Sequence, residues 1–137
     1  MKKVFLDTNV IIDLVLEREG ADAAEAILHK SELGLVYPCV SFLTIANMAY
    51  ICRKSITSEA LYDVIRDLAE IASVLPMNES QLFDALDMPA PDFEDLLQYV
   101  CAKANKCDVI FTRNKKDFPF TELPILTPEE FLFSFEN

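Results

Sequence analysis

Glycine, histidine and tryptophan are nearly absent from this chain of 137 residues, which has two glycines, one histidine and no tryptophan. With only Gly20 and Gly34, no glycine-rich loop is available to cradle phosphates, which excludes P-loop and Rossmann nucleotide binding. One histidine without thiolate neighbours does not build a zinc site. No apolar run approaches the ~18 residues that cross a bilayer, and no signal peptide is recognisable. We therefore expect a soluble cytoplasmic protein with no membrane contact.

Basic residues are also scarce: 12 Lys and Arg stand against 23 Asp and Glu, and the net charge is −11. None falls between residues 67 and 102, whereas they gather at residues 53–54, Lys103, Lys106 and residues 113–116. Contact with a nucleic acid would therefore be local and salt-sensitive, with Arg113, Lys115 and Lys116 as candidate RNA contacts. The alternative is that these are ordinary solvated helix ends and loops.

The four cysteines show no close pairing such as Cys-x-x-Cys, and each lies inside an apolar pattern. That usage fits a reducing compartment better than a disulfide framework. We predict buried thiols without a chemical role, and Cys107 is predicted to be the most exposed of them.

Short apolar runs alternate with helical patterns, the order that is typical of an α/β fold with a mainly parallel, doubly wound sheet and helices on both faces. The predicted strands are residues 2–6, 35–40, 72–75, 109–112 and 125–126. The predicted helices are residues 9–17, 21–33, 42–53 and 79–86, with others beginning near residues 58, 92 and 127. The length fits a single domain over residues 1–137.

The most informative stretch is the apolar run Val4-Phe5-Leu6, which ends in Asp7-Thr8-Asn9. Ligands of open α/β sheets bind beyond the carboxyl ends of the strands, which is where Asp7 is placed. The alternative is that Asp7 only caps the helix that follows. Asp13, one turn beyond Asn9, is expected on the solvated side of that helix.

Polar residues also follow the other strands. Ser41 begins a helix that carries Asn47, Asp92-Phe93-Glu94-Asp95 opens another helix, and Thr112-Arg113-Asn114 is followed by Asp117-Phe118. In this order and spacing, the chain resembles a PIN domain, the nuclease fold of VapC-type toxins of bacterial toxin–antitoxin pairs. The resemblance covers nearly the whole chain.

The resemblance implies that Asp7, Asp95 and Asp117 are catalytic and that, with Asn114, they bind Mg²⁺ or Mn²⁺. Such a cation takes oxygen ligands and generates a hydroxide nucleophile from water. The alternative for Asp95 is an acid favoured by the helix dipole, behind Asp92 as N-cap. Auxiliary positions are Asn47, Asn9, Thr8, Ser41 and Thr112, although capping is an equally good role for the three hydroxyl residues.

Two positions depart from the family pattern. PIN nucleases usually carry an acid, often Glu, where this chain has Asn47, and another acid where it has Asn114. An amide oxygen can coordinate a cation but brings no charge. Asp117, three residues beyond Asn114, either replaces the missing acid or caps a turn. We expect weaker metal binding than at a site with four acids.

The function implied by the resemblance is a metal-dependent endoribonuclease of VapC-like PIN type. It would hydrolyse RNA phosphodiester bonds with metal-activated water, form a homodimer and be restrained by an antitoxin protein. The alternative is a PIN-fold module that binds RNA or protein with weak or lost catalysis, because of Asn47 and Asn114. Haloacid-dehalogenase-like phosphatases also begin with an apolar strand that ends in Asp. They normally need a second Asp two residues later, where this chain has Asn9, so that family fits poorly.

Overall fold

The chain alternates strands and helices from end to end in a computed structural model, which describes residues 2–88, 90–118 and 122–136, with side chains as far as residue 133. The elements in chain order are β1 (Lys2–Leu6), α1 (Thr8–Val15), α2 (Ala21–Glu32), β2 (Val36–Ser41), α3 (Phe42–Cys52), α4 (Ser58–Ile71), β3 (Ser73–Leu75), α5 (Glu79–Leu86), α6 (Phe93–Ala104), β4 (Val109–Phe111), the 3₁₀ helix η1 (Lys115–Asp117), β5 (Ile125–Leu126) and α7 (Pro128–Glu136). The predicted elements are all present, with most ends shifted by one or two residues.

The five strands form one parallel sheet in the order β3-β2-β1-β4-β5. The central strand is β1, in which Phe5 is aligned with Cys39 of β2 and Ile110 of β4. Strand segments buried on both faces are apolar, which is why residues 4–6 of β1 and all of β4 form continuous hydrophobic runs. The predicted mainly parallel α/β fold is confirmed.

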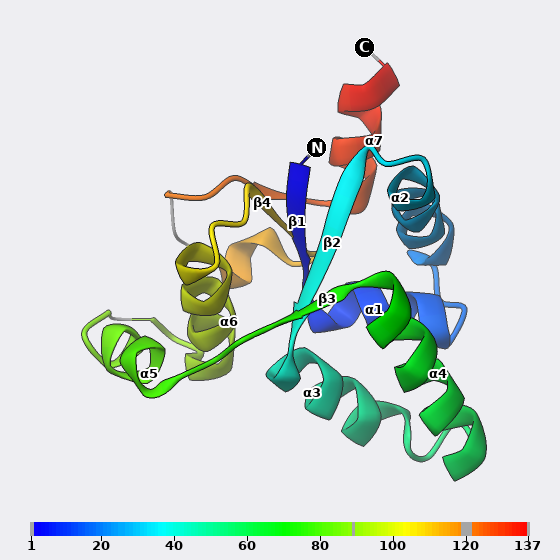
Figure 1. Cartoon of the computed structure of the whole chain (residues 1–137), viewed down its shortest axis with the longest axis horizontal. Coiled ribbons are helices and arrows are strands. Elements are labelled where there is room, and N and C mark those ends of the chain that lie inside the picture. The colour runs from blue at the N-terminus through cyan, green and yellow to red at the C-terminus, as the bar shows by residue number, and fades with distance from the viewer. Residues whose placement is uncertain (1, 89, 119–121, 137) are drawn as a thin grey trace.

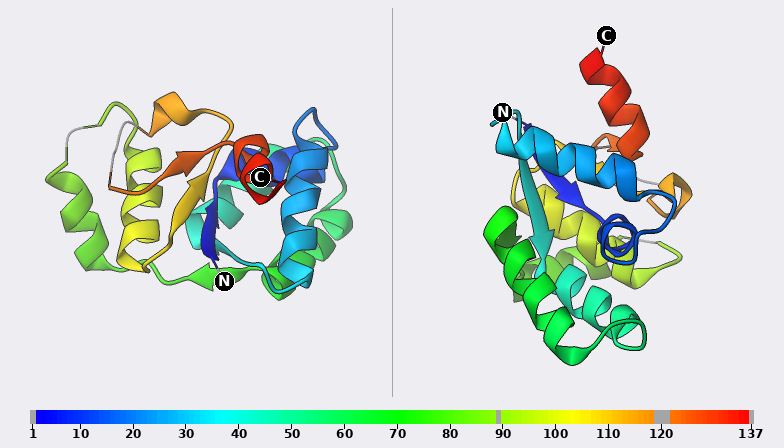
Figure 2. Two further views of the ribbon diagram at one scale, coloured as in Figure 1. Left: turned by 90° about the horizontal axis from the view of Figure 1, so that it is seen from above. Right: turned by 90° about the vertical axis from the view of Figure 1, so that its right-hand side faces the viewer.

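Helices cover both faces of the sheet (Figures 1 and 2). Val4 and Leu6 point into a core shared with α1, α2, α3, α4 and α7, whereas Phe5 between them points into a second core, which α5 and α6 cover. Alternation along one strand thus feeds two cores. On the first side, the ring of Phe131 of α7 packs at a tilt of 53° against that of Phe111 of β4, with ring centroids 4.5 Å apart.

One sequence prediction about exposure, that Asp13 is solvated, is wrong. Asp13 is 1% exposed, because α2 and the segment after β4 cover that side of α1. Cys107 is buried against the core under α6, with Cys39 and Cys101. All four cysteines are unpaired and buried, as predicted, and Cys107 is the most exposed of them at 4%. Among the helices of the described residues, none combines the length and the apolar character needed to span a membrane.

Candidate active site

Asp7 is fixed at the carboxyl end of the central strand. It is the N-cap of α1: Oδ1 accepts a hydrogen bond from the Thr8 amide at 2.8 Å, and Oδ2 accepts one from the Thr112 hydroxyl at 2.8 Å. Thr112 lies directly after β4, the strand next to β1. The carboxylate is 5% exposed, and burial raises its pKa. Asp7 therefore has the predicted capping role, while it lies where ligands of such sheets bind.

Asp95 lies in the first turn of α6, where Asp92 is the N-cap and accepts a hydrogen bond from the Asp95 amide at 3.0 Å. Burial, followed by the negative charges of Asp92, Asp7, Asp117 and Glu94 in that order, raises the pKa of Asp95 from 3.8 to about 7. Asp117, at the end of η1, also raises the pKa of Asp7. The fold thus brings the three acids predicted as catalytic within electrostatic reach of one another.

A buried polar side chain that the sequence analysis passed over, Gln98, ties three elements together beneath these acids. Its Oε1 accepts hydrogen bonds from the hydroxyls of Ser41 and Thr44, both at 3.0 Å, and its Nε2 donates to the Thr8 hydroxyl at 3.2 Å. Gln98 is fully buried. The sequence pattern that could have pointed to Gln98 is its position three residues after Asp95, which places both side chains on the same face of a helix. Ser41 and Thr8, predicted as auxiliary residues, support α3 and α1 here.

Asn47 faces the first turn of α6. Its side-chain Nδ2 donates a hydrogen bond to Oε1 of Glu94 at 2.6 Å. Burial raises the pKa of Glu94, and the charges of Asp92 and Asp7 raise it too. The position that usually carries an acid in PIN domains therefore holds an amide that binds a carboxylate from the opposite helix. Sequence patterns alone marked Glu94 only as a first-turn acid.

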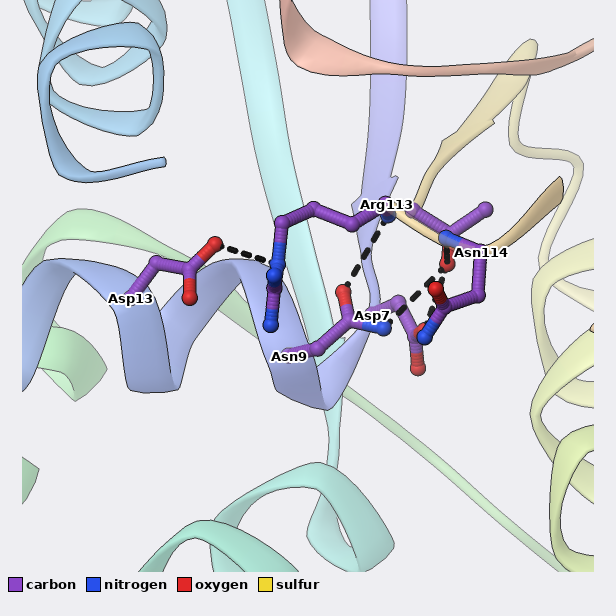
Figure 3. Close-up of polar contacts among 6 residues, drawn as sticks. Asp7, Asn9, Asp13, Arg113 and Asn114 are labelled. Carbon is purple, nitrogen blue, oxygen red and sulfur yellow. Dashed lines mark hydrogen bonds and ion pairs between the residues drawn. The ribbon is translucent and has the colours of Figure 1, made fainter. Parts of the chain in front are cut away.

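The segment after β4 is attached to α1 by side-chain amides and hydroxyls (Figure 3). Asn9 donates from Nδ2 to the Thr112 hydroxyl at 3.4 Å and accepts at Oδ1 from the Arg113 amide at 3.3 Å. The backbone amide of Asn114 donates a hydrogen bond to the Thr112 hydroxyl at 3.1 Å. Thr112 is thus shared by Asp7, Asn9 and Asn114. Coordination of a cation by Asn114 stays a prediction.

Two of the three predicted RNA contacts are engaged with acids. Nε of Arg113 lies 2.5 Å from Oδ2 of Asp13, and Nζ of Lys115 lies 3.2 Å from Oε2 of Glu130. Lys116 is exposed. The positive potential available to a phosphate backbone at this loop is therefore smaller than the sequence alone indicated.

A divalent cation suits this set of donors. Within the described residues, none of Asp7, Asp95, Asp117 and Glu94 forms an ion pair with a basic side chain. Neighbouring negative charges raise the pKa of Asp7, Glu94 and Asp95. No three acidic, histidine or cysteine side chains among the described residues are close enough to form a closed metal cage. Mg²⁺ does not need one, because it retains several waters and is commonly held by one or two carboxylates with a substrate phosphate.

Fold and site together define an α/β domain with an acidic centre at the carboxyl ends of its strands. A family model described as PIN domain matches residues 3–116, and the chain belongs to the PIN domain family. Ribonuclease VapC1 of Aquifex aeolicus is 32% identical over 139 residues, which cover 95% of this chain and 93% of that protein. The sequence-based prediction of a VapC-like PIN ribonuclease is confirmed.

Solved structures share the fold. VapBC-1 of nontypeable Haemophilus influenzae superposes with a TM-score of 0.70 at 25% identity, covering 93% of this chain and 98% of that one. VapBC2 of Rickettsia felis, solved bound to a DNA fragment from its promoter, gives a TM-score of 0.73 at 16% identity, covering 90% and 96%.

Proposed function

We propose that this chain is a VapC-type toxin endoribonuclease that uses Mg²⁺ or Mn²⁺, with Asp7, Asp95 and Asp117 as its acidic centre. The observation that carries the proposal is the gathering of these acids around the carboxyl ends of β1 and β4, where burial and mutual repulsion raise the pKa of Asp7 and Asp95. Such a cluster is relieved by a cation. The likeness to Ribonuclease VapC1 over nearly the whole chain supports RNA as the substrate.

Asp7, Asp95 and Lys116 have different roles in the proposed reaction. Asp7 is held rigidly by Thr8 and Thr112, so it is suited to anchor the cation. A bound divalent cation supplies an activated water and neutralises charge that develops on the phosphoryl group. Asp95, with a pKa of about 7 in the metal-free site, loses its proton near neutral pH and is then free to bind the cation. Lys116 is exposed in η1, next to Asp117, and is suited to contact the RNA backbone.

We also propose that Glu94 supplies the acid that the family pattern would place at position 47. The side-chain amide of Asn47 donates a hydrogen bond to Oε1 of Glu94 at 2.6 Å. Asp7 is near enough to Glu94 for the charge of Asp7 to raise the pKa of Glu94. The carboxylate would thus come from α6 instead of α3. This leaves the site with a fourth negative charge despite the asparagine.

We propose two partners, of which the first is suggested by the likeness to the VapBC complexes. The first is an antitoxin whose basic side chain would neutralise Asp7, Asp95 and Asp117. The second is another copy of this chain, supported by the exposed apolar residues Phe42 and Tyr50 on α3, each 66% exposed. Light scattering at micromolar concentration tests the homodimer, and a strict monomer would remove it.

Cleavage of structured RNA in Mg²⁺, in Mn²⁺ and in EDTA tests the proposed activity. Asp7→Asn and Asp95→Asn are expected to lose most of the cleavage, because each removes a charged oxygen ligand and keeps the shape of the side chain. Asp84→Asn, an exposed position on α5, is the matched control and should cleave like the wild type. Unchanged cleavage by both site variants would show that the site is elsewhere. RNA binding without cleavage by the wild type would favour the binding-module alternative.

A further inference from the structure

Asp13 is a buried carboxylate on α1 that the proposed chemistry does not use. Its Oδ2 pairs with Nε of Arg113 at 2.5 Å, and its side chain is 1% exposed against 39% for that of Arg113. Its Oδ1 has no hydrogen-bond partner among the described residues. A buried ion pair gives little net stability, because the loss of hydration offsets the attraction of the charges. A gain in stability therefore does not account for the buried ion pair between Asp13 and Arg113.

The pair belongs to a two-point attachment of the segment after β4. Asn9 and Asp13 are four residues apart on α1 and so share one face of the helix. Asn9 accepts a hydrogen bond from the backbone amide of Arg113, and Asp13 binds its side chain. Figure 3 shows the Arg113 side chain extending along α1 toward Asp13. Residue 113 is thus held at both its backbone and its guanidinium group.

Gly20 makes room for this pair. A Cβ atom placed there would overlap Oδ2 of Asp13, and it would lie 3.1 Å from Cγ of Asp13 and 3.3 Å from Cδ of Arg113. Gly20 has a φ of −82°, which any residue can adopt, so the backbone does not require glycine at the start of α2. Glycine is required at position 20 because the ion pair of Asp13 and Arg113 occupies the space that a Cβ atom would fill.

The attached segment carries part of the acidic centre. On one side of Arg113, Thr112 donates to Oδ2 of Asp7; on the other side lie Asn114, whose amide donates to Thr112, and then Asp117. Asp117 is close enough to raise the pKa of Asp7 and Asp95. A shift of residue 113 would therefore move a carboxylate relative to the other two.

We propose that Asp13 and Gly20 are positioning residues of the nuclease site: they anchor Arg113 so that the segment 112–117 presents Asp117 to Asp7 and Asp95. Arg113 is then a structural anchor of the site and not a contact to RNA. This inference rests on the proposed function, since the geometry it fixes is that of the cation site.

Calorimetric titration of Mn²⁺ tests the anchor directly. Asp13→Asn and Arg113→Gln should each weaken Mn²⁺ binding about tenfold or more, as is common when a group that orients metal ligands is lost. The double variant should be no weaker than the single ones, because both remove the same contact. Gly20→Ala keeps both charges and crowds them, so it should weaken binding in the same direction even where Asp13→Asn folds poorly. Asp22→Asn, exposed on α2, is the control.

RNA binding in EDTA separates the anchor from a direct contact. The anchor predicts that both single variants bind RNA within about twofold of the wild type, and that kcat falls in Mn²⁺ while KM stays unchanged. Wild-type Mn²⁺ affinity in Asp13→Asn and Gly20→Ala, or additive losses in the double variant, would overturn the inference. So would weaker RNA binding by Arg113→Gln in EDTA. If the wild type itself binds no Mn²⁺, the proposed function fails first, which keeps the two failures distinct.

Discussion

Mn²⁺ affinity should fall steeply as the pH is lowered through the pKa of Asp95. Burial, followed by the charges of Asp92, Asp7 and Asp117, raises that pKa from 3.8 to about 7. A proton and the cation compete for the same carboxylate. A group with this pKa is ionised to about nine-tenths at pH 8 and about one-tenth at pH 6. The dissociation constant for Mn²⁺ should therefore rise about tenfold between pH 8 and pH 6.

The same shift has a defined sign for stability. Because the folded-state pKa of Asp95 lies above its unfolded value, the folded state binds the proton more tightly. This contribution to the free energy of unfolding is fully present below pH 3.8 and is lost as the pH rises to about 7. Relative to Asp95→Asn, the metal-free wild type should lose thermal stability over that interval. Mn²⁺ should restore it at pH 8, where the carboxylate is free to bind.

Calorimetric titrations at pH 6, 7 and 8 measure the first effect, and thermal denaturation with and without Mn²⁺ measures the second. Asp92→Asn is the informative variant, since it removes the neighbouring charge that raises the pKa of Asp95 most, whereas Asn remains a good N-cap for α6. The fall in affinity should then move to lower pH. The control Asp84→Asn should leave the fall in Mn²⁺ affinity at the same pH as in the wild type. Equal Mn²⁺ affinity at pH 6 and pH 8 would show that Asp95 does not bind the cation.

Three further substitutions are informative. Asn47→Glu should tighten Mn²⁺ binding in a calorimetric titration, because it adds a carboxylate beside Glu94; an equal affinity would show that position 47 does not face the cation. Gln98→Leu removes three buried hydrogen bonds worth about 1 kcal/mol each and should lower the free energy of unfolding in urea by about 2–4 kcal/mol, whereas no change would contradict the network. Phe131→Ala should cost about 3–5 kcal/mol in the same assay, since it empties the space against Phe111; a smaller loss would mean that α7 packs loosely.

Much of the fold was determined by local sequence. The apolar runs of the strands, the cap residue Asp92 and the alternation of strands with helices predicted the parallel α/β architecture, because hydrophobic period and end-capping are local properties. Asp7 could also be placed, since the carboxyl end of a buried parallel strand is a fixed location in such a sheet. The order of the motifs was enough to indicate the PIN family.

What only the tertiary structure decided concerns side chains from distant segments. Asp13 is buried and not solvated because Arg113, a hundred residues away in sequence, lies against it, and Gly20 leaves the space. Asn47 meets Glu94 because packing brings α3, which follows β2, opposite the first turn of α6, which follows α5. Periodicity describes which face of a helix is apolar, but it does not state which charge from another segment faces it. Burial and pairing of charges depend on that packing, so the pKa of Asp95 and the anchoring of Arg113 were accessible only from the folded chain.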